Sequence, residues 1–159
     1  MKTYRGLILS LAGTLLAALL LLPSAARAQA TTSTFSIQVS GSASQAKTGL
    51  GELVNFSGTL LITAVVVTDP LMPPMVVVSI DGRNVTGIGQ KTGTVYKNEL
   101  EANLTRTFQA TDTIQTTFAF FADAPGSYLT SKTGVLNLNL SYDTTSMALT
   151  GASGSLGTL

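Results

Sequence analysis

Apolar side chains occupy every second position through much of the chain after residue 28. The clearest stretch is LNLNLSY at residues 136–142, where Leu and Tyr alternate with Asn and Ser. A period of two is that of a β-strand, and it predicts a sheet with one face on a core and the other in water. Three further stretches alternate in the same way, and in each the following residues share one face of their own strand: Phe35, Ile37 and Val39 in the first; Tyr96, Leu100, Ala102, Leu104 and Phe108 in the second; Ile114, Thr116, Phe118 and Phe120 in the third.

One stretch breaks the alternation, and turn residues separate the others. Residues 60–67 read LLITAVVV, which predicts a strand covered on both faces or lying at the centre of a sheet, with residues 76–80 as its partner. Asp81-Gly82 predicts a tight hairpin into residues 84–88. Residues 143–146 predict a turn that joins 136–142 to 147–150. The chain thus reads as eight or nine short strands, and no segment after residue 28 has a helical period.

This pattern favours an all-β fold, an antiparallel β-sandwich of immunoglobulin-like or jelly-roll type. A closed small barrel is the alternative, because it shows the same alternation. An outer-membrane barrel also alternates, but it needs belts of aromatic residues, and the chain after residue 28 has three Tyr and no Trp.

Residues 1–28 have the three parts of a secretory signal peptide. Lys2 and Arg5 form a basic start, residues 7–22 are apolar, and the small residues Ala26 and Ala28 precede the expected cut. Cleavage after Ala30 fits the same rule. The apolar run has 16 residues, fewer than the roughly 20 that span a bilayer. We expect a cleaved leader (1–28), no stable membrane span afterwards, and one domain (29–159) exported to the periplasm or the extracellular space of a bacterium.

Composition narrows the chemistry of that domain. The chain has no Cys and no His, so it lacks the usual donors for zinc, copper, haem or iron–sulfur sites and the usual general base. No calcium-loop motif is present either, and we expect no cofactor and no metal. Loss of Lys2, Arg5 and Arg27 with the leader leaves six basic residues against eight acidic ones, which gives no basic field for nucleic acid.

No motif selects a catalytic centre. The tripeptide Lys-Thr-Gly occurs at residues 47, 91 and 132, each time before an extended segment, which indicates recurring turns. The carboxylates are scattered and form no local pair. We therefore expect no enzyme, with a carboxylate-based hydrolase as the remaining enzymatic alternative.

The most unusual segment is the expected loop at residues 69–75. Its three prolines favour an extended polyproline conformation, and its Leu and Met residues place adaptable apolar groups where polar ones are usual. The alternative is a crossover that folds the Met side chains over one end of the core. The candidate contact residues are Asp69, Pro70, Leu71, Met72, Pro73, Pro74 and Met75.

The sequence thus predicts an exported, non-enzymatic binding, adhesion or structural module of the cell envelope or extracellular space. Its expected partner is a protein or a surface glycan, and exposed strand edges offer a route to self-association. The alternative is a carrier that holds a sugar or a lipid in a barrel-like cavity.

Overall fold

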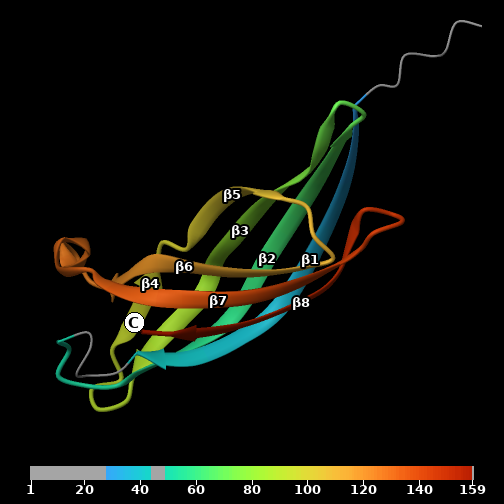
Figure 1. The fold of residues 1–159 in the computed structure, drawn as a ribbon. Coiled ribbons are helices and arrows are strands. Elements are labelled where there is room, and N and C mark those ends of the chain that lie inside the picture. Colours follow the sequence, from blue (N-terminus) through green and yellow to red (C-terminus); the bar gives the residue numbers. More distant parts are fainter. Residues whose placement is uncertain (1–27, 44–48, 159) are drawn as a thin grey trace, which may run out of the picture.

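The computed structural model describes residues 28–43 and 49–158. The expected leader and its cleavage site fall almost wholly outside these residues. The described chain forms eight strands, in the order β2-β1-β8-β7-β6-β4-β3-β5, with a further pairing between β2 and β3 (Figure 1). The strands are β1 (Gln29–Ala43), β2 (Val54–Asp69), β3 (Met72–Gly89), β4 (Val95–Asn98), β5 (Glu101–Thr107), β6 (Thr111–Ala122), β7 (Lys132–Asp143) and β8 (Ala148–Gly157), with one 3-10 turn, η1 (Ser127–Thr130), before β7.

The sheet closes into a seven-stranded barrel, with β5 as an extra strand beside β3. The prediction of an all-β fold is confirmed, but the sandwich is not, and the barrel alternative is the better description. In Figure 1, β6, β7 and β8 pass in front of β1 to β3, yet both groups belong to one sheet. Alternation cannot separate the two folds, because each has one inward and one outward face. Strands β1 to β3 have 15, 16 and 18 residues, which is long enough for each to curve around the barrel and pack against strands on its opposite side.

The Asp81-Gly82 hairpin prediction is wrong, because β3 runs through both residues. Thr59 pairs with Asn84 and Leu61 with Asp81, so β3 carries one extra residue here, a β-bulge. A Cβ on Gly82 would lie 2.7 Å from Leu60 and 2.6 Å from Leu100. Glycine therefore serves close packing at the bulge instead of a turn. The bulge divides β3 between two partners, since residues 75–81 pair with β5 and residues 87–88 with β4.

Residues 60–67 lie inside the sheet, as one of the two alternatives for this strand predicted, because β2 pairs with β1 on one side and with β3 on the other. The other alternative, cover on both faces, is wrong. Leu60, Ile62, Ala64 and Val66 point into the barrel and are buried, but Leu61 is 45% exposed and Val67 36%. Their expected partner, residues 76–80, does pair with them. No second layer of described residues covers Leu61 and Val67 on the outer face of β2.

Apolar side chains fill the barrel interior. The ring of Phe56 on β2 meets that of Phe120 on β6 edge to face, with centroids 4.9 Å apart. Because these strands lie on different sides of the barrel, the contact spans its interior. The turn predicted at residues 143–146 is confirmed: Asp143 Oδ1 accepts hydrogen bonds from the backbone N–H groups of Thr145 and Ser146, at 2.7 and 2.9 Å.

The barrel closes where β1 meets β8 in parallel, through the single register pair Gly41–Leu156. A Cβ at position 41 would overlap the backbone carbonyl of Leu156. Near the other end of this seam, the Leu149 N–H donates to Ser33 Oγ at 2.9 Å. Closure therefore depends on a glycine at one end and a side-chain bond at the other.

Candidate functional site

The predicted contact segment forms the turn of a protruding hairpin between β2 and β3. Asp69 pairs with Met72, so only Pro70 and Leu71 lie in the turn. Asp69 Oδ1 accepts a hydrogen bond of 2.8 Å from the Leu71 N–H. This Asx-type bond and the fixed φ of proline hold the two-residue turn. The segment is thus neither a polyproline loop nor a crossover, because both flanks pair as strands.

Prolines 73 and 74 lie within β3, where the register shifts. Val67 pairs with Met75 and Asp69 with Met72, which leaves one extra residue on β3 at the two prolines. A bulge tolerates proline, since the missing N–H groups break no regular ladder there. The Pro74 carbonyl accepts a hydrogen bond of 2.9 Å from the Phe108 N–H. The base of the hairpin is therefore fixed to the chain that follows β5.

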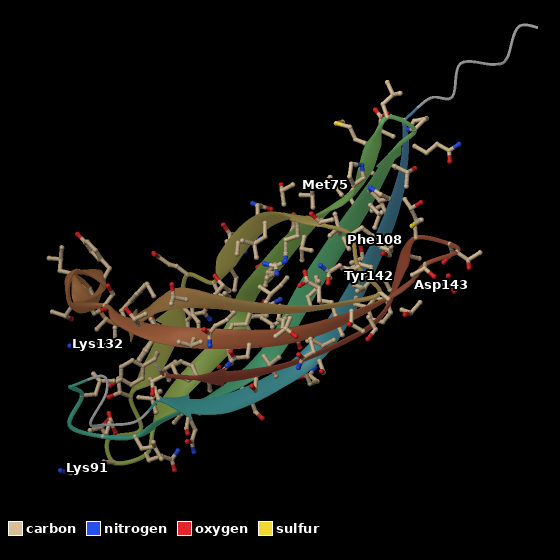
Figure 2. The ribbon with its side chains drawn as sticks, viewed as in Figure 1. Met75, Lys91, Phe108, Lys132, Tyr142 and Asp143 are labelled. Carbon is tan, nitrogen blue, oxygen red and sulfur yellow. The ribbon has the colours of Figure 1, made fainter. Side chains whose placement is uncertain are left out.

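The tip presents apolar side chains to solvent. Leu71 is 92% exposed and Met72 is 63% exposed, so neither folds over the core as the crossover alternative required. On the outer face behind the tip, Val67 pairs with Met75 and Val65 with Val77. We name Leu71, Met72 and these four residues the apolar tip. In Figure 2, Met75 lies toward this end of the molecule, and Lys91 and Lys132 lie at the opposite end.

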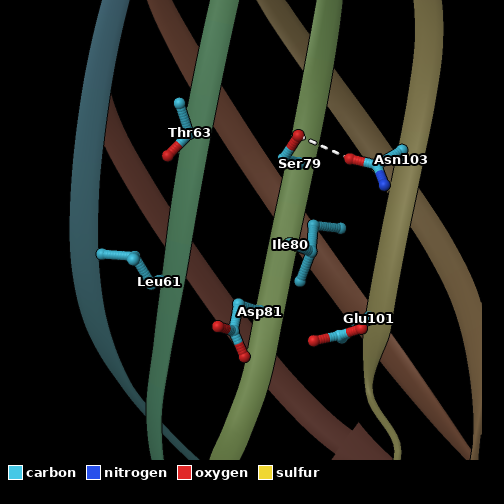
Figure 3. A pocket seen from close by; sticks show the side chains of 7 residues that line it. All are labelled: Leu61, Thr63, Ser79, Ile80, Asp81, Glu101 and Asn103. Carbon is cyan, nitrogen blue, oxygen red and sulfur yellow. Dashed lines mark hydrogen bonds between the residues drawn. The ribbon is translucent and has the colours of Figure 1, made fainter.

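A shallow polar groove of about 240 Å³ crosses the outer face of β2, β3 and β5 (Figure 3). Ser79 Oγ donates a hydrogen bond of 2.6 Å to Asn103 Oδ1 in this groove. Asp81 and Glu101 are register partners at its lower end in the figure. The groove is lined by Leu61, Thr63, Ser79, Ile80, Asp81, Glu101 and Asn103.

The Arg83 guanidinium forms ion pairs with both carboxylates of this groove. It lies 2.6 Å from Asp81 Oδ2 through one terminal nitrogen and 3.1 Å from Glu101 Oε1 through Nε. The side-chain hydrogen bonds from Arg83, with its backbone N–H and its charge, lower the pKa of Asp81. A carboxyl group with a lowered pKa is a poor general acid, so Asp81 does not suit that role in glycoside hydrolysis.

A second polar cluster lies where β5 passes into β6. Arg106 Nε lies 2.6 Å from Asp112 Oδ2, at the wall of a recess of about 310 Å³. Arg106 and Asp112 form an ion pair, but Asp112 Oδ2 accepts no hydrogen bond from the guanidinium. The hydroxyl of the buried Tyr142 has no hydrogen-bond partner among the described residues. Burial, and then the Asp112 charge, raise the pKa of Tyr142 to about 12, with Arg106 opposing.

Two buried polar residues that sequence reasoning did not single out hold turns and bulges. Glu52 accepts hydrogen bonds from the Lys91 and Thr92 N–H groups, the Thr92 hydroxyl and the Tyr96 hydroxyl. Asn98 donates to the carbonyls of Gly82 and Val85 and accepts from the Leu100 N–H. The alternation of apolar residues places Asn98 on the inward face between Tyr96 and Leu100, and this pattern could have predicted its burial. No pattern around Glu52 predicts its burial.

The Lys-Thr-Gly copies occupy different places. Lys91 lies in the turn between β3 and β4, as expected, whereas Lys132 opens β7 and Lys47 falls outside the described residues. They do not gather into one site.

The strand edges that were expected to allow self-association are mostly removed by closure. Among the described residues, β5 pairs only with β3, and residues 111–119 of β6 pair only with β7. Along the seam, β1 and β8 share the single register pair Gly41–Leu156. Strands β5 and β6 are joined at their ends, because the Glu99 N–H donates to the Ala119 carbonyl at 3.0 Å and Arg106 meets Asp112. Between these points no ladder of described residues connects them.

Among residues 28–43 and 49–158, no three acidic side chains gather closely enough to hold a metal ion. Within the same described ranges, no helix has the length and apolar character needed to cross a bilayer. No protein-family model matches the chain, and neither a curated protein nor a solved structure matches it.

Proposed function

We propose that this chain is an exported, non-enzymatic binding module that contacts the cell envelope through the apolar tip. The observation that carries the proposal is the exposure of Leu71 (92%) and Met72 (63%) at the end of a hydrogen-bonded, two-residue turn. Exposed apolar side chains grouped on a fixed element are typical of contact sites. The leader-like residues 1–28 support export.

The packed interior favours a binding module over the carrier alternative. The Phe56 and Phe120 rings meet across the barrel, and Leu60, Ile62, Leu136 and Leu138 are fully buried around them. These side chains occupy the space that a carried sugar or lipid needs. The ion-paired state of Asp81 and Glu101 disfavours a hydrolase at the groove of Figure 3.

Co-sedimentation with bacterial envelope fragments tests this proposal. The processed chain from Gln29 is suitable, because all eight strands lie between Gln29 and Gly157. We expect the wild type to sediment with the fragments and the double variant Leu71→Ser/Met72→Ser to remain in the supernatant. Leu129→Ser is the matched control, since Leu129 is 77% exposed on η1. Equal sedimentation of all three proteins, or of none, contradicts the proposal.

A second candidate function is assembly through the one-sided edge of β6. The Ala119 carbonyl points away from β7 and the Ala110 carbonyl points toward it, so odd-numbered residues such as Thr113 direct their backbone groups outward. Proline at position 113 therefore breaks no bond to β7 but blocks strand addition. If β6 mediates assembly, size exclusion separates oligomeric wild type from monomeric Thr113→Pro; a monomeric wild type at high concentration removes this candidate.

A further inference from the structure

We infer that the apolar tip docks on the surface of a lipid bilayer, at the end of the barrel where the leader joins it. This inference rests on the proposed function and names the envelope component that the tip contacts. It commits to lipid because of three features: where the chain enters the barrel, how far the hairpin reaches, and which charges surround it.

The chain enters the barrel beside the tip. Gln29, the first residue of β1, pairs with Thr68, which is next to the turn residue Asp69. Residues 23–28 separate β1 from the apolar run at 7–22, and six extended residues span at most about 20 Å. While that run is held by a bilayer, the tip is therefore kept within reach of the same bilayer.

The hairpin reaches beyond its neighbour β5. The last register pair between β3 and β5 is Met75–Thr107, so residues 72–74 and the turn extend past the end of β5. At about 3.3 Å per residue, three residues carry the turn about 10 Å beyond β5, while on the other side β1 accompanies β2 as far as the Gln29–Thr68 pair. This length matches the roughly 5–10 Å depth of the interfacial region in which apolar side chains of peripheral proteins lie.

The charges near the tip favour apolar contact over electrostatic attraction. Asp69 is the charged residue of the turn, and its carboxylate accepts the Leu71 N–H. Arg106, the register partner of Val76 beside the tip, is ion-paired with Asp112, and Lys91 and Lys132 lie at the opposite end of the barrel (Figure 2). A surface that recognises anionic lipid carries clustered Lys or Arg. Docking should therefore occur on zwitterionic lipid and depend little on salt.

Docking through this tip alone is weak. A single myristoyl chain gives only marginal, reversible membrane binding, and the Leu71 and Met72 side chains are smaller than that chain. Attachment of the leader to the same bilayer raises the effective concentration of the tip, so weak contacts suffice to orient the barrel. The attached leader therefore strengthens docking by the tip, and the processed chain still binds through the tip, reversibly and at high lipid concentration.

Tryptophan fluorescence tests the inference directly, because the chain contains no Trp. The processed variant Leu71→Trp is mixed with phosphatidylcholine vesicles at millimolar lipid. We expect its emission to shift to shorter wavelength and to be quenched by brominated lipid. Leu129→Trp, at a position that is also exposed (77%) but lies on η1, should show neither effect. Adding Met72→Asn to Leu71→Trp should lower the fraction shifted, and raising the salt concentration should not.

The outcomes separate this inference from the proposed function. No shift with vesicles, together with tip-dependent sedimentation with envelope fragments, overturns lipid docking and points to a protein or glycan partner. A shift that grows with protein concentration in the absence of lipid overturns it in favour of a second copy. Binding that requires anionic lipid and is lost at high salt also contradicts it, because that behaviour belongs to basic groups such as Arg106 and not to the apolar side chains of the tip.

Discussion

The hydroxyl of Tyr96 donates a hydrogen bond of 3.2 Å to Oε1 of Glu52, a residue 44 positions earlier in the chain. Gly89 allows this contact, because a Cβ there would overlap the Glu52 carboxylate. Glu52 thereby ties the start of β2 to the β3–β4 turn. The hydrogen bonds from Thr92 and Lys91, with that from Tyr96, lower the pKa of Glu52, although desolvation opposes them.

Replacing Glu52 with Gln should lower the free energy of unfolding at neutral pH. The variant should then lose less of that free energy than the wild type does when the pH is lowered. A carboxyl group whose pKa is lowered by folding stabilises the protein above its unfolded value of 4.5, and that contribution disappears as the pH falls through the folded value. Urea midpoints measured between pH 7 and pH 3 should therefore converge for wild type and Glu52→Gln at low pH. Glu99→Gln, at an exposed position, is the control; a constant gap across the range contradicts the prediction.

Replacing Gly41 with Ala should open the β1–β8 seam. The new methyl group overlaps the Leu156 carbonyl, and displacement of packed backbone costs about 1–3 kcal/mol or more. Gly157→Ala is a matched control on β8, because a Cβ there meets nothing within 4 Å. Thermal unfolding followed by circular dichroism should show a lower midpoint for Gly41→Ala only. Equal midpoints would mean that the seam does not limit stability.

Replacing Tyr142 with Phe should change stability little at neutral pH. Its hydroxyl is buried without a partner, so its removal should alter the free energy of unfolding by less than about 1 kcal/mol. The pKa of Tyr142 rises from 10 to about 12 on folding, so the unfolded chain ionises first and the free energy of unfolding falls as the pH rises between those values. The variant should therefore lose less stability than wild type between pH 10 and 12. A large loss at pH 7 would reveal a bonded hydroxyl.

Replacing Asn98 with Ala should weaken the bulge region of β3. The variant leaves the buried Gly82 and Val85 carbonyls and the Leu100 N–H without the partners they now have. Each unsatisfied buried group of this kind costs about 1–3 kcal/mol. We expect the free energy of unfolding, measured in urea, to fall by about 3 kcal/mol in total. Asn103→Ala, which removes one exposed bond to Ser79, should stay within about 0.5 kcal/mol of wild type.

The alternation of apolar and polar residues by itself determined which face of most strands is buried. Leu136, Leu138 and Leu140 are buried as the period of two requires, since consecutive side chains of a strand point to opposite faces. Local turn chemistry also sufficed at Asp143, because the bond from its side chain to the next residues forms within the turn itself.

Only the tertiary structure decided how the strands join and what the irregular residues do. Asp81-Gly82 has the composition of a hairpin turn, but the packing of Leu60 and Leu100 against Gly82 makes it a bulge. Likewise, the sequence marked residues 69–75 as unusual, but their exposure depends on how far β2 and β3 extend beyond β5. Barrel closure, the Glu52 contacts and the position of Gln29 beside Thr68 join residues far apart in the chain, and local propensity does not encode such pairings.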